Sequence, residues 1–277
     1  MAFNRLVCFV IGDRVSFGDL LSVNGGTYNA RRLTSDPFTK LQPTEDIIQV
    51  EKVGFAPIGN RVSCSGNWPI WHHDIHPDAR EMLDYEGELT VVMGRDAKNI
   101  LEEDAVDYVL GYTAGNDLSA RNFQLPEASR MQFGYSKSFD QFGPIRYTIV
   151  ATSEIPDPQD LRLVAWVKQQ TSTNDMIWSF RQIIGHLSRG MTLRKGTVIM
   201  AGTPAGIGFF TKESLKAGDV VENLNWYFMK QVTVNFKKVE LPVKDTSDHR
   251  YTLKSSIFMY YYPFFDIEKM VARDSKL

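Results

Sequence analysis

Apolar and polar residues alternate along much of this chain, and a period of two residues is typical of β-strands that bury one face. Near the N-terminus, RLVCFVIGD and RVSFGDLL alternate on either side of Gly12-Asp13, which predicts a β-hairpin. A further stretch, EDIIQVEKVGF, continues the pattern up to a break at Ala56-Pro57. The first 56 residues are therefore expected to form a small β-rich unit.

The same reasoning predicts a strand-rich middle of the chain. Strands are expected at residues 87–95, 108–117, 143–152, 161–170 and 195–200, and at least two more within 217–241. We find neither an internal repeat nor a low-complexity segment. The expected class is α+β, mainly β.

Two segments carry helical signals instead. Residues 174–191 have apolar side chains at 180, 183, 184 and 187, which is the spacing of one helix face, and Gly190 supplies a stop signal. A shorter helix is expected over 99–108, with Asn99 as its N-cap and acidic residues in its first turn. One long and one short helix would then accompany the strands.

The strand and helix signals divide the chain into three segments. Residues 1–56 form the expected N-terminal β-rich domain, and residues 57–243 form the main domain. Residues 244–277 form an aromatic-rich extension that contains the run FMYYYPFF. An irregular stretch, NRVSCSGNWPIWHHDIHPDAREM, opens the main domain and is rich in His, Trp and Pro.

Composition narrows the function classes. The 277 residues are 43% hydrophobic and 23% charged, with a net charge of −2, which is ordinary for a globular protein. The absence of a basic stripe argues against nucleic-acid binding, and no apolar run is long enough to span a bilayer. We expect a cytoplasmic protein in which Cys8 and Cys64 are free thiols, although one disulfide is conceivable.

Three acidic residues form a candidate metal site. Glu86 and Glu88 are two residues apart at the start of a predicted strand, so they project from the same face. Asp117 lies where the next predicted strand ends in a turn. Converging carboxylates suit a hard divalent cation such as Mg²⁺ or Mn²⁺. Taken alone, a Glu-x-Glu pair is more often a solvated strand edge.

Blocks of sequence between Asp84 and Glu222 favour the metal site over the solvated strand edge. In chain order, these blocks are DYEGELTVVMGRDAKNILEEDAVDYVLGYTAGNDLSARNFQ, SKSFDQFGP, GMTLRKGTVIMAGTPAGIG and LKAGDVVE. Together they resemble the fumarylacetoacetate hydrolase superfamily. The resemblance implies a mixed β-sandwich and β-roll catalytic domain with a small N-terminal β domain, and commonly a homodimer.

The resemblance also implies roles for individual residues. Glu86, Glu88 and Asp117 would bind the metal, usually Mg²⁺, with Mn²⁺ and Ca²⁺ as alternatives. Lys137 matches the active-site lysine, whose charge would stabilise an enolate. The residues that match substrate-facing positions are Arg121, Gln124 and Thr203. For Arg121 a structural ion pair is an equally good interpretation.

One part of the family pattern is missing from this sequence. Family hydrolases carry a lid segment upstream of the metal strand, and its His-x-x-Glu dyad activates water. The corresponding stretch here is a few dozen residues shorter and has no His-x-x-Glu. His72 or His73 could replace the base, whereas His76 and His186 are better explained as structural or surface residues.

Three functions remain open from the sequence. The first is a Mg²⁺-dependent enzyme that cleaves or decarboxylates a β-dicarbonyl or 2-oxo acid substrate through a metal-stabilised enolate. The second is an isomerase, tautomerase or cyclase of secondary metabolism that uses the same metal site without hydrolysis. The third is a non-catalytic paralogue that binds a small molecule.

Overall fold

The computed structural model describes residues 2–236 except for 13, 35, 36, 39, 52, 54–70, 74, 131, 141, 166–168, 217, 218 and 226–231. Several expectations lie outside this part of the chain: the boundary at Ala56-Pro57, the thiol of Cys64 and the segment 244–277. The backbone of His72 and His73 is described, but their side chains are not. Cys8 is buried in the first strand.

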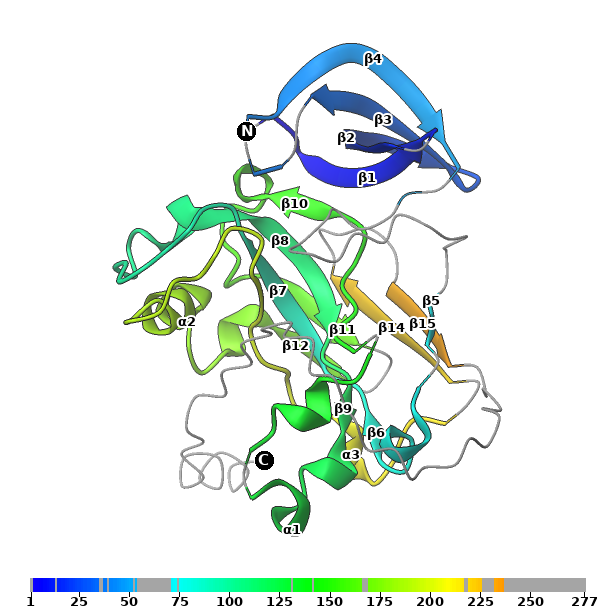
Figure 1. The fold of residues 1–277 in the computed structure, drawn as a ribbon, viewed down its shortest axis with the longest axis vertical. Coiled ribbons are helices and arrows are strands. Elements are labelled where there is room, and N and C mark those ends of the chain that lie inside the picture. The colour runs from blue at the N-terminus through cyan, green and yellow to red at the C-terminus, as the bar shows by residue number, and fades with distance from the viewer. Residues whose placement is uncertain are drawn as a thin grey trace.

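The largest element is an eight-stranded sheet that is antiparallel at every pairing. In spatial order its strands are β13 (Val198–Met200), β7 (Gly87–Met93), β8 (Val109–Asn116), β10 (Ile149–Ala151), β1 (Arg5–Ile11), β2 (Arg14–Asn24), β3 (Thr27–Thr34) and β4 (Gln42–Val50). The predicted hairpin at Gly12-Asp13 is confirmed, because Ile11 pairs with Arg14. Since β1 pairs with β10, the N-terminal strands continue the sheet that contains β7 and β8 (Figure 1).

Two smaller sheets and three short helices complete the part of the fold that the structure describes. The five-stranded sheet has the order β12 (Gln169–Ser172), β11 (Arg162–Ala165), β14 (Val220–Asn225), β15 (Val232–Phe236) and β5 (Trp71–His73), and its β15–β5 pair is parallel. A third sheet pairs β6 (Leu83–Asp84) with β9 (Ser119–Ala120). The helices are α1 (Pro126–Ser129), α2 (Phe180–Leu187) and α3 (Gly208–Thr211). The predicted mainly-β, α+β class is therefore confirmed.

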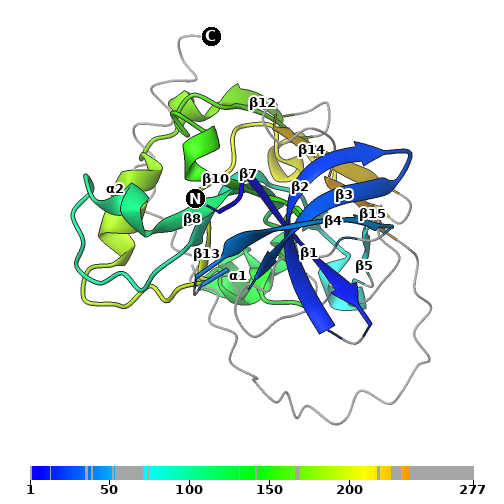
Figure 2. The same cartoon turned by 90° about the horizontal axis from the view of Figure 1, so that it is seen from above.

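The core lies on both faces of β7 and β8, whose residues are all buried. Alternation sends Leu89 and Val91 toward α2, where Tyr112 meets Phe180 edge-to-face at 5.6 Å. The helix and the five-stranded sheet lie on opposite sides of this strand pair (Figures 1 and 2). Glu88, one residue out of phase with Leu89, therefore points away from the apolar layer under α2.

The long predicted helix exists but is shorter than the pattern indicated. It begins after Ser179, whose hydroxyl accepts from the backbone N–H of Gln182 while the Gln182 side chain accepts from Ser179, a reciprocal capping box. Gly190, at φ 69°, follows its C-terminal end as predicted. In the part of the chain that the structure describes, no helix is long and apolar enough to cross a bilayer.

Two predicted elements were wrong. The helix over 99–108 is reduced to a 3-10 turn at Ala105–Tyr108, because Asn99 adopts φ 52° and its side chain accepts from the N–H of Gly190 instead of capping a helix. The single strand expected at 161–170 is a hairpin formed by β11 and β12. At 99–108, a contact with a distant part of the chain thus overrides the local propensity.

Candidate metal centre

The three predicted carboxylates meet where β7 begins and β8 ends, near β6 and β9 in Figure 1. Glu86 and Glu88 flank Gly87, and the β7–β8 register pairs Gly87 with Asn116, one residue before Asp117. Ligand atoms from all three carboxylates lie within 4.8 Å of one another. Each residue is 3% exposed or less, so the group is not a solvated strand edge.

Two backbone contacts hold this arrangement together. The N–H of Asp117 donates to the carbonyl of Glu86 at 2.9 Å, and the N–H of Glu86 donates to the side-chain oxygen of Asn116 at 2.9 Å. The turn after β8 is therefore tied to the residue that precedes β7. These hydrogen bonds hold the backbone beneath the carboxylates, so the carboxylates converge despite their mutual repulsion.

Lys137 reaches the same place from the 3-10 turn Tyr135–Lys137. Its ammonium nitrogen lies 2.7 Å from Glu86 Oε2, 2.5 Å from Asp117 Oδ2 and 2.8 Å from Ser119 Oγ. The residue is only 1% exposed. Lys137 thus spans two of the three carboxylates, a position that the sequence could indicate only through resemblance.

Arg121 also enters this network. Its guanidinium donates from Nε to Asp84 Oδ2 at 2.8 Å, from Nη2 to Glu86 Oε1 at 2.5 Å and from Nη1 to Gln124 Oε1 at 2.7 Å. Arg121 is buried, whereas Gln124 is half-buried. The structural ion pair considered from the sequence is therefore present, and contact between Arg121 and a substrate stays a prediction.

The charges of this network do not balance. Four buried carboxylates (Asp84, Glu86, Glu88 and Asp117) face two buried cations (Lys137 and Arg121), so when all four carboxylates are ionised, four minus two leaves an excess of two negative charges among these described residues. Burying uncompensated charge is costly. A single divalent cation would bring the total to zero.

Asp117 offers a second sign that an ion fits here. Its Oδ1 is buried and has no hydrogen-bond partner among the described residues, although buried carboxylate oxygens are normally paired. Oxygen donors alone, without Cys or His, suit Mg²⁺, Mn²⁺ or Ca²⁺ better than Zn²⁺. The residues present therefore fit a hard divalent cation.

Burial and repulsion shift the acidities of these groups. Burial, reinforced by the charge of Glu86, raises the pKa of Asp117 to about 7 against the opposing effect of Lys137. Burial and the charges of Asp117 and Glu86 hold the pKa of Glu88 well above its usual value. Burial also acts to raise the pKa of Glu86, but Lys137 and Arg121 outweigh it and lower that pKa. Without an ion, the centre tends to retain protons on Glu88 and Asp117.

These shifts predict how the stability of the metal-free protein depends on pH. Because the pKa of Asp117 is raised from 3.8 to about 7 in the folded state, its stabilising contribution is present below the unfolded pKa and is lost as pH rises through about 7. Glu88 acts in the same direction. We expect the melting temperature measured in EDTA to fall between about pH 4 and pH 7, and the increment given by Mn²⁺ to grow over the same range. A flat melting profile in EDTA would contradict the assignment.

Asp84 is a residue of this network that sequence reasoning missed. It is 1% exposed, and besides Arg121 its carboxylate accepts from the backbone N–H groups of Gly208 and Phe209, at 2.7 Å and 3.0 Å. It therefore fastens the start of α3 to the arginine that contacts Glu86. Its position two residues before Glu86 was the only signal available in the sequence.

Replacing Asp84 by asparagine is expected to lower the free energy of unfolding by about 3 kcal/mol, because breaking a buried ion pair leaves Arg121 with one fewer charged partner. Urea denaturation monitored by circular dichroism measures the effect. The matched control is Asp96→Asn, which breaks the exposed Asp96–Arg194 pair and is expected to change stability little. Equal effects in the two variants would contradict a buried network centred on Asp84.

Thr203, the remaining predicted substrate residue, lies in the loop after β13. Its hydroxyl donates to the carbonyl of Gly87 at 3.2 Å and accepts from the side chain of Gln169 at 2.8 Å. The preceding N–H, that of Gly202, donates to Glu88 Oε2 at 2.8 Å. The loop is thus attached directly to the segment that carries Glu86 and Glu88.

The two histidines with described side chains lie outside this network of contacts. His76 accepts from the N–H of Asp78 at the start of a 3-10 turn and stacks on Phe139 at 6.1 Å, which fits the predicted structural role. His186 is exposed on α2. Whether His72 or His73 supplies a base stays a prediction.

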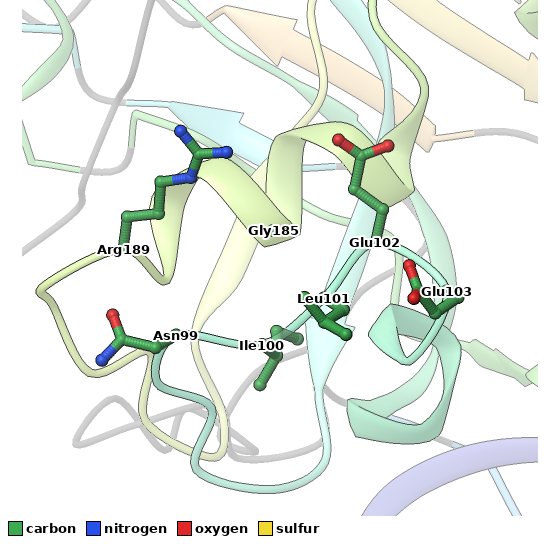
Figure 3. Close-up of a pocket in the computed structure, with 7 residues that line it drawn as sticks. All are labelled: Asn99, Ile100, Leu101, Glu102, Glu103, Gly185 and Arg189. Carbon is green, nitrogen blue, oxygen red and sulfur yellow. The ribbon is translucent and has the colours of Figure 1, made fainter.

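A surface hollow opens elsewhere, between residues 99–103 and the C-terminal part of α2 (Figure 3). Gly185 and Arg189 complete its lining. None of the predicted site residues borders it, so the carboxylate chemistry belongs to a different region of the molecule.

Comparison with known proteins shows which family the chain that carries these carboxylates resembles. The family described as "Fumarylacetoacetate (FAA) hydrolase C-terminal" matches residues 41–224. A Dictyostelium discoideum fumarylacetoacetate hydrolase domain-containing protein 2 homolog is 38% identical over 190 residues, which are 63% of this chain and 60% of that protein. Oxaloacetate tautomerase YisK of Bacillus subtilis is 40% identical over 160 residues, which are 54% of this chain and 52% of that protein.

Solved structures agree with these sequence matches. The crystal structure of 2-hydroxyhepta-2,4-diene-1,7-dioate isomerase from Mycobacterium marinum has a TM-score of 0.63 and 27% identity, over 84% of this chain and 98% of that one. The chain spans about half to three fifths of the length of the curated relatives named here. More than half of the chain is matched by the family, and the protein belongs to the fumarylacetoacetate hydrolase family.

Proposed function

We propose that this protein is a divalent-metal-dependent enzyme that interconverts the keto and enol forms of a small 2-oxo acid of the oxaloacetate type. The observation that carries the proposal is the buried triad of Glu86, Glu88 and Asp117, with its excess of two negative charges and Lys137 alongside. The names of two relatives, oxaloacetate tautomerases of Xenopus laevis and Bacillus subtilis, each 40% identical over about half of this chain, support the reaction type.

The three carboxylates would hold the cation, with Mg²⁺ as the expected ion and Mn²⁺ or Ca²⁺ as substitutes. When bound, the ion supplies a Lewis acid that polarises a substrate carbonyl. Lys137 Nζ contributes a fixed positive charge near the oxygen that gains negative charge. Arg121 holds Glu86 and Gln124 in place, and Asp84 holds Arg121.

Tautomerisation requires fewer catalytic groups than hydrolysis does, because no water molecule has to be activated. A proton leaves the carbon next to the carbonyl and a proton reaches the carbonyl oxygen, so no carbon–carbon bond breaks and no water is consumed. The missing His-x-x-Glu pattern, which activates water in family hydrolases, is therefore not required. Cleavage or decarboxylation of the same substrates remains the second candidate, because the family match carries the hydrolase name and the enolate step is shared.

A direct assay separates these activities. Enol oxaloacetate is mixed with the protein and Mg²⁺, and the loss of enol absorbance is followed while pyruvate and oxalate are quantified by chromatography. We expect enol loss that depends on Mg²⁺, is abolished by EDTA and yields keto oxaloacetate. Formation of pyruvate or oxalate at the same rate would favour decarboxylation or cleavage, and no acceleration of any of the three reactions would support a non-catalytic binding protein.

A further inference from the structure

Gln169, the first residue of β12, is a fully buried polar side chain whose hydrogen bonds join the residue between Glu86 and Glu88 to the loop after β13. It is 0% exposed. Its Oε1 accepts from the N–H of Gly87 at 3.1 Å, and its Nε2 donates to Thr203 Oγ1 at 2.8 Å and to the carbonyl of Pro204 at 2.9 Å. A buried amide is costly unless it is satisfied, and here one side chain joins β7 to the loop after β13.

Together with the bonds from the loop after β13, these hydrogen bonds hold the segment from Glu86 to Glu88 in place. Gly87 lies between Glu86 and Glu88, and its N–H is held by Gln169 while its carbonyl is held by the Thr203 hydroxyl. The next loop residue back, Gly202, donates to Glu88 Oε2. The distance between the loop and the carboxylates is therefore set by a few polar contacts, and Gln169 belongs to three of them.

This arrangement determines which hydrogen-bond donor of Thr203 is left for a ligand. The single proton of its hydroxyl is directed at Gly87, and the same oxygen already accepts from Gln169. The backbone N–H of Thr203 makes no hydrogen bond to any residue that the structure describes. The group that remains to donate is thus the main-chain N–H, and its position depends on how the side chain is anchored.

We propose that Gln169 is a positioning residue that fixes the main-chain N–H of Thr203 at the correct distance from the carboxylates to bind an anionic oxygen of a 2-oxo acid or its enolate. The proposal rests on the proposed function, because it assumes that the substrate binds beside the cation. Gln169 itself does not touch the substrate. Its loss should weaken anion binding more than metal binding, since none of its hydrogen bonds involves a carboxylate of the triad.

Oxalate is a suitable probe, since it is a planar dianion that resembles the enolate of a 2-oxo acid and cannot react. Calorimetry first measures the Kd of Mn²⁺ alone and then the Kd of oxalate for the Mn²⁺-loaded protein. For Gln169→Met, we expect oxalate to bind about tenfold more weakly, a loss equal to about one hydrogen bond. The Kd of Mn²⁺ should stay within about threefold, since its ligands are intact. Gln170→Met, at the exposed neighbouring position, is the matched control and should bind both as the wild type does.

A double-mutant cycle separates positioning from general loss of structure. Thr203→Val removes the hydroxyl that Gln169 anchors, and we expect Gln169→Met to add little further loss of oxalate affinity in that background. Thr203→Ser keeps the hydroxyl and should restore binding. If Gln169→Met fails to fold, Gln169→Asn, which keeps the amide but shortens its reach, is expected to show the same selective loss of oxalate.

The outcomes distinguish this inference from the function on which it rests. Wild-type affinity for oxalate in Gln169→Met would overturn the positioning role and leave the proposed function standing. Equal losses of Mn²⁺ and oxalate affinity would also overturn it, because they indicate collapse of the whole centre. Failure of the Mn²⁺-loaded wild type to bind oxalate would overturn the proposed function together with this inference.

Discussion

Replacement of Lys137 by methionine is expected to lower the rate of metal-dependent tautomerisation by about 100-fold or more, because a fixed charge beside the developing enolate is lost. The same change should destabilise the metal-free protein by about 3–5 kcal/mol, since Glu86 and Asp117 lose the buried cation between them. It should also enlarge the rise in melting temperature that Mn²⁺ gives, because the ion then offsets more negative charge. Thermal melts with and without Mn²⁺, together with the enol assay, measure all three effects.

Lys98→Met is the matched control, because Lys98 is exposed and should affect none of the three quantities. A Lys137→Met protein that keeps full activity would remove Lys137 from the chemistry. A smaller Mn²⁺ response than in the wild type would show that Lys137 supports the ion rather than competing with it.

The second large effect concerns Glu88, and its two parts have opposite signs. Glu88→Gln is expected to stabilise the metal-free protein at about pH 8, because burial and the charges of Asp117 and Glu86 hold the pKa of Glu88 well above its usual value. The neutral amide removes the repulsion with Glu86 and Asp117, and its oxygen can still accept from Gly202. The variant should nevertheless lose its response to Mg²⁺ and Mn²⁺, because a charged ligand is gone.

Urea titrations with EDTA and with Mn²⁺, each at about pH 5 and pH 8, measure this trade-off. The stabilisation should shrink at the lower pH, because protonation of Glu88, which its raised pKa favours, removes the same repulsion in the wild type. Glu81→Gln, an exposed position nearby, controls for the loss of one acidic charge. A destabilised Glu88→Gln protein in EDTA would mean that the carboxylates are balanced by other groups.

Local sequence patterns could predict the strands of this fold and one side of its site. Glu86 and Glu88 project together because a strand alternates, and the stretch from Gly87 to Met93 is the strand expected from its apolar residues. The hairpin at Gly12 follows from a turn signal of two residues. Such features depend only on neighbours in the chain, and they were predicted correctly.

Local sequence patterns could not predict the features that depend on contacts between distant residues. Asp117 meets Glu86 only because β7 pairs with β8 in one register, and Lys137 enters from a separate turn. Resemblance to a family indicated these residues before any contact was known. The role of Gln169 was missed altogether, because its partner Gly87 lies 82 residues away and a glutamine on a strand carries no local signal.

The predicted helix over 99–108 failed for a related reason. Its residues have helical propensity, but the N–H of Asn99 donates to the carbonyl of Ser188, and the N–H of Ile100 donates to the Ser188 hydroxyl. These bonds hold residues 99 and 100 against the end of α2, outside any helix. Nothing in the segment itself reveals that its backbone is needed elsewhere.

The central claim, that the buried carboxylates form a divalent-metal centre, is tested most directly by calorimetric titration of EDTA-stripped protein with Mn²⁺ at about pH 8, where the ligands can lose their protons. We predict that the wild type binds one ion per chain and that Asp117→Asn, which neutralises the carboxylate whose Oδ1 lacks a partner among the described residues, loses this binding. No heat of binding at millimolar Mn²⁺, or identical binding by the wild type and Asp117→Asn, would contradict the account.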